Sequence, residues 1–186
     1  MLLSDGLRSA LVLFAVFLGV VGAPGRAAAR DWPNADLVAQ AELPLPADHL
    51  TAKLSDLAVH KAVWTGNCSR DWTVGSPGAG VGATAHMTYA VDSWRRELDG
   101  RISRVVAPIL EASHPGRVDL DHAGKKGFQT VWTLTPVGPD RTRVEVHTYL
   151  STPPWPVRRA YYNGVQPKWS ACHASAIQAL GTVAAR

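Results

Sequence analysis

The segment from Gly127 to Leu150 constrains the fold most, because it predicts a long hairpin of two strands. Apolar and β-branched residues alternate with polar ones along both halves, with the period of two that is typical of strands. The residues at 136–140 include two prolines and a glycine and predict the turn. One side of the hairpin must be covered by another part of the chain; it carries Phe128, Thr130, Trp132, Leu134, Thr142, Val144, Val146, Thr148 and Leu150.

The same alternation predicts five more strands before the hairpin. Short turns, including a glycine-rich one at 75–82, connect those that follow the first helical segment, so these sequence neighbours are expected to pair antiparallel. The polar segment 114–126 is predicted to be an irregular connection. The five predicted strands cover residues 36–43, 69–74, 83–91, 95–106 and 109–113.

Three stretches have the residue spacing of helices. Residues 48–64 carry regularly spaced leucines behind Asp48, a favourable N-cap, and form one helix or two short ones. A short helix is predicted over 157–162, and a long amphipathic one over 167–183. Because a sheet with one apolar face needs a helix packed on it, the long C-terminal helix is predicted to be its cover. The fold class is therefore α+β.

Residues 1–29 predict a secretory leader that is cleaved off. An apolar run over 10–23 is followed by Ala27-Ala28-Ala29, which matches the small-x-small cleavage pattern. The run is shorter than the roughly 20 residues that a membrane-spanning helix needs. An uncleaved membrane anchor is the alternative. We therefore expect a single domain over 30–186, in a protein that is exported to the periplasm or secreted.

The charge of the chain gives little sign of a nucleic-acid partner. The formal net charge is +4. The leader holds two arginines and one aspartate, a net of +1, which leaves +3 for residues 30–186. These charges are spread out and form no basic cluster with interleaved aromatic residues. A solvated surface is the favoured interpretation, and the sequence identifies no protein partner.

The two cysteines, Cys68 and Cys172, predict one disulfide bond. An even, minimal number of cysteines in an exported protein is typical of a single bridge. The alternative is that both are separate small residues buried in the core.

The motifs along the chain resemble the START-type helix-grip superfamily, also called SRPBCC, in its polyketide cyclase/dehydrase-like branch. The resemblance covers residues 36–183 and rests on turns and packing positions rather than on catalytic groups. It is carried by Gly80-Val81-Gly82, by 95–102 leading into 105–108, by 128–138 followed by 142–144, and by the last helix with Trp169 and Leu180.

The resemblance implies a seven-stranded antiparallel sheet curled round a long C-terminal helix, with a cavity between them. Members of the superfamily bind lipids, hormones, polyketides or other apolar molecules, and a minority are cyclases or hydrolases. The residues expected to line such a cavity could also simply fill the core. They are Met87, Tyr89, Leu98, Ile102, Phe128, Trp132, Leu134, Val144, Val146, Trp169 and His173.

The seven histidines do not predict a metal centre. His86 and His147 alternate with apolar neighbours and should face outward, while His114 and His122 fall in the predicted irregular connection. His173 lies next to the apolar stripe of the last helix and is the one expected near the cavity. The spacing of histidines and carboxylates matches none of the common metal-binding patterns, so neither a metal nor another cofactor is predicted.

The sequence favours a binding protein over an enzyme. The leading hypothesis is an exported helix-grip protein that holds an apolar or amphipathic, lipid-like molecule between sheet and helix. An enzyme of the cyclase or dehydratase type is the first alternative, and it needs an acid or base such as Tyr89, Arg104 or Tyr161 inside the cavity. A structural or interaction protein with a filled core is the second alternative.

Overall fold

The described part of the chain forms one sheet with three helices on its inner face. The computed structural model describes residues 37–91, 94–109, 114–123, 128–150 and 166–186. The strands are β1 (Leu37–Leu43), β2 (Ser69–Val74), β3 (Thr84–Val91), β4 (Trp94–Val106), β5 (Gly116–Ala123), β6 (Phe128–Gly138) and β7 (Arg141–Leu150). The helices are α1 (Ala47–Leu54), α2 (Leu57–Trp64) and α4 (Gln166–Ala184).

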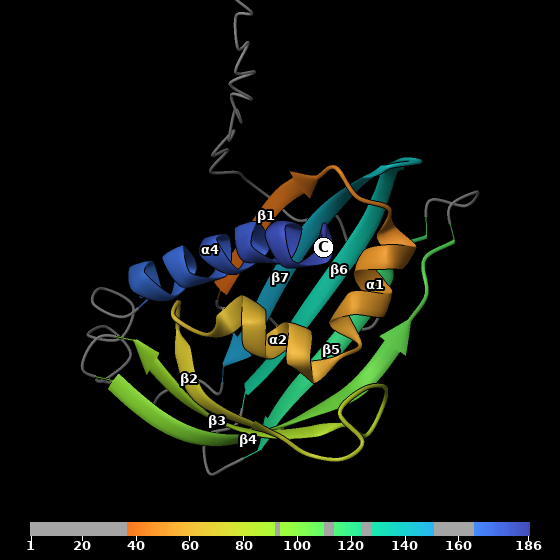
Figure 1. Ribbon diagram of the computed structural model, residues 1–186. Coiled ribbons are helices and arrows are strands. Elements are labelled where there is room, and N and C mark those ends of the chain that lie inside the picture. Colours follow the sequence, from red (N-terminus) through yellow and green to blue (C-terminus); the bar gives the residue numbers. More distant parts are fainter. Residues whose placement is uncertain (1–36, 92–93, 110–113, 124–127, 151–165) are drawn as a thin grey trace, which may run out of the picture.

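The seven strands pair in the order β1-β7-β6-β5-β4-β3-β2, and every neighbouring pair is antiparallel. Figure 1 shows the sheet curving beneath α1, α2 and α4. The predicted α+β class and the curved seven-stranded antiparallel sheet are confirmed.

The predicted hairpin is the β6–β7 pair, which has the longest register of the strand pairs in the described sheet. Trp132 pairs with Val146 and Leu134 with Val144, and all four side chains are completely buried. The connection is tighter than predicted, because β6 continues through a bulge to Gly138 and only Pro139 and Asp140 form the turn. Pairing over about ten residues fixes which side chains face the helices.

The fifth strand was predicted at the wrong place. It spans 116–123 rather than 109–113, and the pairing of β5 with β4 and β6 shows that 114–126 is not simply an irregular connection. Val118, Leu120 and His122 face the core, whereas the charges of Asp119 and Asp121 point to the outer face. Residues 110–113 lie outside the described residues.

An aspartate on the outer face of β5 is buried by arginines. Two nitrogens of Arg117 donate to the carboxylate oxygens of Asp119, at 2.6 and 2.8 Å, and Arg104 of β4 lies 3.7 Å from it. These partners neutralise the carboxylate where it leaves water. Charged residues can therefore sit on a central strand without facing the core.

Three helices cover the inner face of the sheet, whereas the sequence analysis predicted that the last helix alone would cover it. The first predicted helix is two helices, broken at Ser55, and Asp56 caps α2 by accepting from the Ala58 backbone N–H at 2.7 Å. Asp48 lies inside the first turn of α1, because that helix begins at Ala47. α1 packs on β5 and β6, while α4 packs chiefly on β1 and α2.

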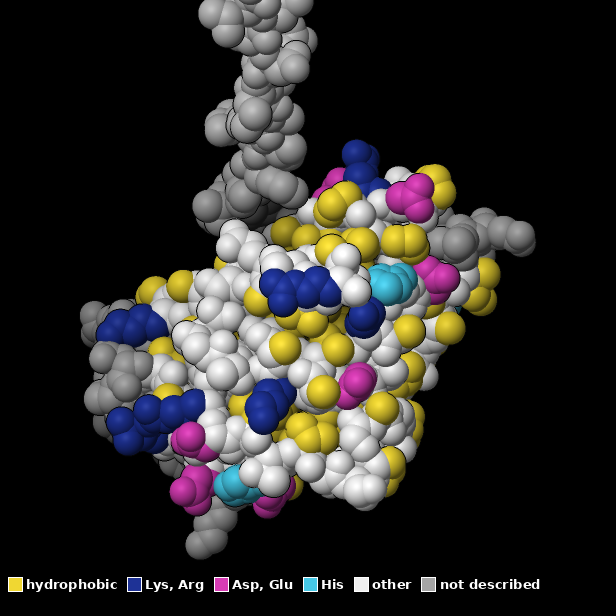
Figure 2. Space-filling model, in the orientation of Figure 1, with side chains coloured by type: hydrophobic (Ala, Val, Ile, Leu, Met, Phe, Trp, Pro, Cys, Tyr) yellow, Lys and Arg dark blue, Asp and Glu magenta, His cyan; other side chains and the backbone are white. Residues whose placement is uncertain are grey.

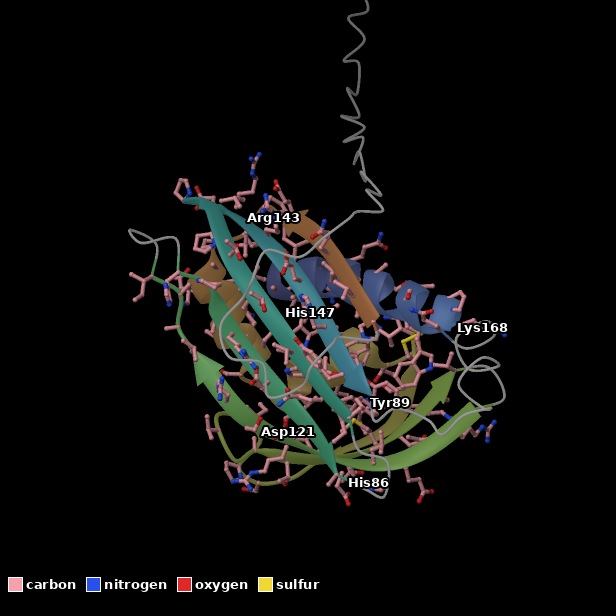
Figure 3. All side chains as sticks on the ribbon, turned by 180° about the vertical axis from the view of Figure 1, so that it is seen from behind. His86, Tyr89, Asp121, Arg143, His147 and Lys168 are labelled. Carbon is pink, nitrogen blue, oxygen red and sulfur yellow. A yellow bond between two sulfur atoms is a disulfide. The ribbon has the colours of Figure 1, made fainter. Side chains whose placement is uncertain are left out.

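A disulfide bond joins Cys68, between α2 and β2, to Cys172 in α4, with 5.7 Å between the Cα atoms. The predicted pairing is confirmed. The bond holds α4 beside the end of α2 (Figure 3).

Other sequence-based expectations concern the surface and the termini. On the face shown in Figure 2, Lys and Arg side chains lie among uncharged and acidic ones. Within the described residues, no helix has both the length and the apolar character that crossing a membrane requires. The leader over 1–29 and the short helix over 157–162 lie outside the described residues.

Candidate functional site

The eleven residues predicted to line a cavity all lie in the layer between the sheet and the helices. Each is at most 4% exposed. They come from every strand between β3 and β7 except β5, and from α4; they are Met87, Tyr89, Leu98, Ile102, Phe128, Trp132, Leu134, Val144, Val146, Trp169 and His173. The fold thus brings them together, and their binding of a ligand stays a prediction.

Aromatic rings fill the middle of this layer. Tyr89 of β3 stacks on Trp169 with 5.6 Å between ring centroids and meets Phe128 edge-on at 5.1 Å. Trp64 of α2 contacts Trp132 of β6 at 5.8 Å. Figure 3 shows Tyr89 under the curve of the sheet. Such rings offer large flat apolar surfaces to one another and to any molecule that enters.

A row of four buried polar side chains crosses this layer from the sheet to α4. Thr148 of β7 lies 2.7 Å from Nε2 of His173 and 3.3 Å from the hydroxyl of Thr130 on β6. Tyr89 is hydrogen-bonded to Thr130 in turn. We call Tyr89, Thr130, Thr148 and His173 the paired row. All four are at most 2% exposed.

The direction of each hydrogen bond in the paired row follows from one carbonyl. Nδ1 of His173 lies 2.7 Å from the carbonyl oxygen of Trp169, which can only accept, so Nδ1 carries the proton. Burial lowers the pKa of His173 to about 4, so the ring is neutral and Nε2 accepts from Thr148. Thr130 then donates to Thr148. Each member of the row therefore has a hydrogen-bond partner.

A second set of buried polar side chains lies beside the row, and its hydrogen bonds are incomplete. It consists of His60 and Trp64 on α2, His122 on β5 and Trp132 on β6, and we call it the unpaired cluster. His60 and Trp64 each lie next to Trp132, with ring centroids 6.3 and 5.8 Å apart. His122 stacks on Phe128 at 4.1 Å and interacts electrostatically with His60.

Five polar atoms of the unpaired cluster are buried without a hydrogen-bond partner among the described residues. They are Nδ1 of His60, Nε1 of Trp64, Nε1 of Trp132 and both ring nitrogens of His122. Burial lowers the pKa of His60 to about 4 and that of His122 to about 3, so both rings are neutral at pH 7. Each buried polar atom left unpaired costs about 1–3 kcal/mol. A molecule that pairs with them would recover part of that cost.

Comparison with known proteins identifies the architecture through structure alone. No family model and no curated protein matches the sequence. The solved KanY protein superposes with a TM-score of 0.61 at 16% identity, covering 80% of this chain and 96% of its own. The Zhui aromatase/cyclase from Streptomyces sp. R1128 gives a TM-score of 0.60 at 10% identity, covering 81% and 93%. This protein has the helix-grip fold.

A third helix-grip structure is norcoclaurine synthase from Thalictrum flavum, with a TM-score of 0.55 at 17% identity over 79% of this chain and 91% of that one. The same plant enzyme has been solved in complex with dopamine and hydroxybenzaldehyde. At these identities the likeness establishes the fold, and the function must be argued from the site of this chain.

Three residues of the unpaired cluster in this helix-grip core, His60, Trp64 and His122, were missed from sequence. His122 was assigned to an irregular connection, although it continues the alternation of Val118 and Leu120 across β5. His60 was read only as part of a helix; its spacing of four from Trp64 places both on one buried face of α2. These two patterns were the available signals.

The outward-facing histidines are where the sequence placed them. His86 on β3 lies 2.9 Å from Asp99 and its side chain is 50% exposed. His147 lies 3.3 Å from Glu145, and its hydrogen bond lowers the pKa of that carboxyl. Figure 3 shows His86 and His147 on the outer side of the sheet. Both are therefore remote from the unpaired cluster.

The three residues predicted as candidate acids or bases lie in different parts of the chain. Tyr89 lies in the core, and burial raises its pKa. Arg104 is on the outer face, where it neighbours Asp119, so it does not enter the core. Tyr161 lies outside the described residues. In the described part of the chain, no three His, Cys, Asp or Glu side chains are grouped so as to hold a metal ion.

A hollow of about 560 Å³ also lies on the outer face of β2, β3 and β4. It is open and polar, and its lining includes Arg70 and Asp71, which pair with each other at 3.6 Å. Arg95 and Glu97 add one charge of each sign. Such a surface has no strong preference for an anion or a cation, and it is separated from the unpaired cluster by the sheet.

Proposed function

We propose that this protein binds an apolar or amphipathic small molecule in the layer between the sheet and the helices. The observation that carries the proposal is the unpaired cluster: five buried polar atoms without partners among the described residues, surrounded by aromatic and aliphatic side chains. A site that is mostly apolar and holds a few convergent polar groups is the usual form of a small-molecule site. A core that served packing alone would gain nothing from such atoms.

The molecule would enter by displacing side chains, because the described core residues are in contact with one another. Met87 is suited to move. Its methyl group lies 2.7 Å from the point where a Cβ of Gly100 would be, and Nδ1 of His122 lies 3.6 Å from that point. Methionine is flexible and adapts to the shape of its neighbours. A shift of Met87 would therefore open space beside the unpaired cluster.

Native mass spectrometry of the purified protein tests the proposal. We expect a co-purifying mass that is lost on unfolding, or binding to at least one member of a panel of fatty acids, sterols, glycerolipids and aromatic ketones. Unfolded protein of the same preparation is the control. The proposal fails if no mass co-purifies and no member of the panel binds.

An acid–base enzyme of the cyclase or dehydratase type is the second candidate. The convergence of Tyr89, His60 and His122 in one core favours it. The pKa shifts oppose it, because a general base works best with a pKa near the operating pH. Burial lowers the pKa of both histidines and raises that of Tyr89, which makes each group a weaker catalyst at pH 7. Binding is therefore the function that we propose.

We also propose that the protein is exported after removal of residues 1–29. The disulfide between Cys68 and Cys172 supports this, because such bonds persist in oxidising compartments and are rare in the cytosol. The mass of the protein recovered from its native cell tests it. A chain that begins at residue 30 in an envelope or culture fraction is the expected result, and a chain with Met1 intact contradicts it.

A further inference from the structure

The chemistry of the ligand can be narrowed further from the unpaired cluster, if the interior of this protein binds a molecule as proposed above. Each side chain of this cluster offers a defined number of hydrogen-bond donors and acceptors. These donors and acceptors determine which groups a bound molecule must carry.

Two of the four side chains can only donate. The indole nitrogens of Trp64 and Trp132 carry a hydrogen and have no lone pair to offer. A molecule that satisfies them must present oxygen or nitrogen acceptors, such as carbonyl or hydroxyl oxygens. An alkyl chain cannot do this, and it would leave both donors unpaired.

His60 needs the opposite group. Its Nε2 lies 2.7 Å from the carbonyl oxygen of Leu54 and therefore carries the proton. Nδ1 of the neutral ring is left as an acceptor without a partner among the described residues. His122 adds one donor and one acceptor, whichever of its nitrogens is protonated. Only a molecule with a hydroxyl or amide hydrogen can donate to these acceptors.

The described part of the core holds no charged side chain that could balance an ionised group. Among the buried side chains of the described residues, the single carboxylate is that of Asp119, which faces outward and is held by Arg117. No buried Lys or Arg side chain faces the core in the same part of the chain. An anion or cation moved into this layer would lose its hydration without gaining a counter-ion.

The walls of the layer suit a flat molecule. Rings of Trp64, Trp132, Tyr89 and Phe128 meet one another at steep angles around the cluster, so flat surfaces are offered in several orientations. We infer that the interior site selects uncharged molecules that carry both hydroxyl and carbonyl-type oxygens on a planar apolar frame, and that Trp132, His60 and His122 read those oxygens. Fatty acids and other ionised lipids are disfavoured.

Three probes with one frame test this selection: 2-naphthol, naphthalene and 2-naphthoate. They are added to the folded protein at pH 7, and the indole ¹H–¹⁵N NMR signals of Trp64 and Trp132 are followed together with the affinity from calorimetry. We expect 2-naphthol to bind at least about tenfold more tightly than either other probe, a difference of about 1.4 kcal/mol. It should also shift the Trp132 indole signal downfield.

Variants assign the selection to the cluster. Trp132→Phe and His122→Leu should each reduce the preference for 2-naphthol over naphthalene to less than about threefold, while His86→Gln on the outer face should leave it unchanged. Circular dichroism checks that each variant is folded, and either one of the two core variants suffices for the test.

The outcomes separate this inference from the proposed function. Equal or tighter binding of 2-naphthoate or naphthalene overturns the inference while the binding function stands, as does co-purification of an ionised lipid. A co-purifying neutral hydroxylated molecule supports it. If none of the probes binds, no ligand co-purifies and the lipid panel is silent, the proposed function itself is wrong.

Discussion

The paired row and the unpaired cluster lie in the same core and are buried to the same degree, yet their hydrogen bonding is opposite. In the row, the chain from Tyr89 to His173 satisfies each side chain through the next. In the cluster, five nitrogen atoms have no partner among the described residues. Burial alone therefore does not separate the two regions, whereas the completeness of their hydrogen bonds does.

The two regions also connect different parts of the fold. The row links β3, β6 and β7 to α4, so it fixes the C-terminal helix on the sheet. The cluster links α2 to β5 and β6, where a change of side-chain position would not break a hydrogen bond between side chains. We therefore expect the row to carry stability and the cluster to carry binding. Four measurements test this division.

Acid should have the largest effect, because each region holds neutral buried histidines. The folded pKa values of His60, His122 and His173 are about 4, 3 and 4, below the ordinary 6.5. Their contribution to stability is fully present above pH 6.5 and is lost as the pH falls toward 4. Each histidine lowers the free energy of unfolding by about 1.4 kcal/mol per pH unit in that range.

Urea unfolding at a series of pH values between 7 and 4 measures this slope. In the His122→Leu variant the free energy of unfolding should fall less steeply with pH, by about 1.4 kcal/mol per pH unit. His86→Gln changes an exposed ring and should match the unmodified protein. A flat profile between pH 6.5 and 5 would show that the histidines take up protons as readily in the folded state as in the unfolded state, and that their pKa values are not lowered.

Loss of the disulfide should have the next largest effect. Cys172 directly precedes His173, so the bond holds the helical end of the paired row beside α2. The bond joins residues 104 apart, and a loop of that size contributes about 4–5 kcal/mol in the chain-entropy account. The Cys68→Ser, Cys172→Ser double variant should lose about that much stability in urea unfolding.

Hydrogen exchange of the same variant shows where the loss falls. Faster exchange is expected over the first half of α4, with β6 and β7 protected as before. If α4 keeps its protection and the loss is below about 1 kcal/mol, the paired row holds the helix without the disulfide.

The sequence predicted the fold well because alternation with a period of two reports directly which face of a strand is buried. The fifth strand was misplaced where this signal was mixed with charge: Asp119 and Asp121 made the segment look like a loop. Arg117 lies two residues before Asp119 on the same face of the strand and was the available signal, whereas Arg104 reaches Asp119 only through the pairing of β4 with β5.

The site was predicted less completely than the fold, for a related reason. Apolar lining residues such as Trp132 and Val146 follow from the hairpin pattern. The hydrogen bond between Thr148 and His173 joins β7 to α4, which are far apart in the sequence. His122 is unpaired because none of the described elements around it places a hydrogen-bonding group within reach. Such facts depend on tertiary packing, and a single sequence does not state them.

A matched pair of substitutions compares the two regions directly. His173→Leu removes the acceptor of Thr148 and the donor to the Trp169 carbonyl, so it should lower the free energy of unfolding by about 3 kcal/mol at pH 7. His122→Leu removes two nitrogens that have no partner among the described residues, so it should leave the free energy of unfolding unchanged or raise it, by up to about 3 kcal/mol. Urea unfolding of both variants provides the measurement. Equal losses would mean that the two regions do not differ in kind.

Removing single hydroxyls from the paired row should have the smallest effects and should rank them by geometry. Thr148→Val deletes the donor of the 2.7 Å bond to His173 and should cost about 2 kcal/mol. Thr130→Val deletes the longer 3.3 Å bond to Thr148 and the partner of Tyr89, and we expect about 1 kcal/mol. Valine keeps the shape of threonine, so the differences report on the hydrogen bonds. If the Thr130 variant loses more stability than the Thr148 variant, the link to Tyr89 rather than the link to α4 is the stronger part of the row.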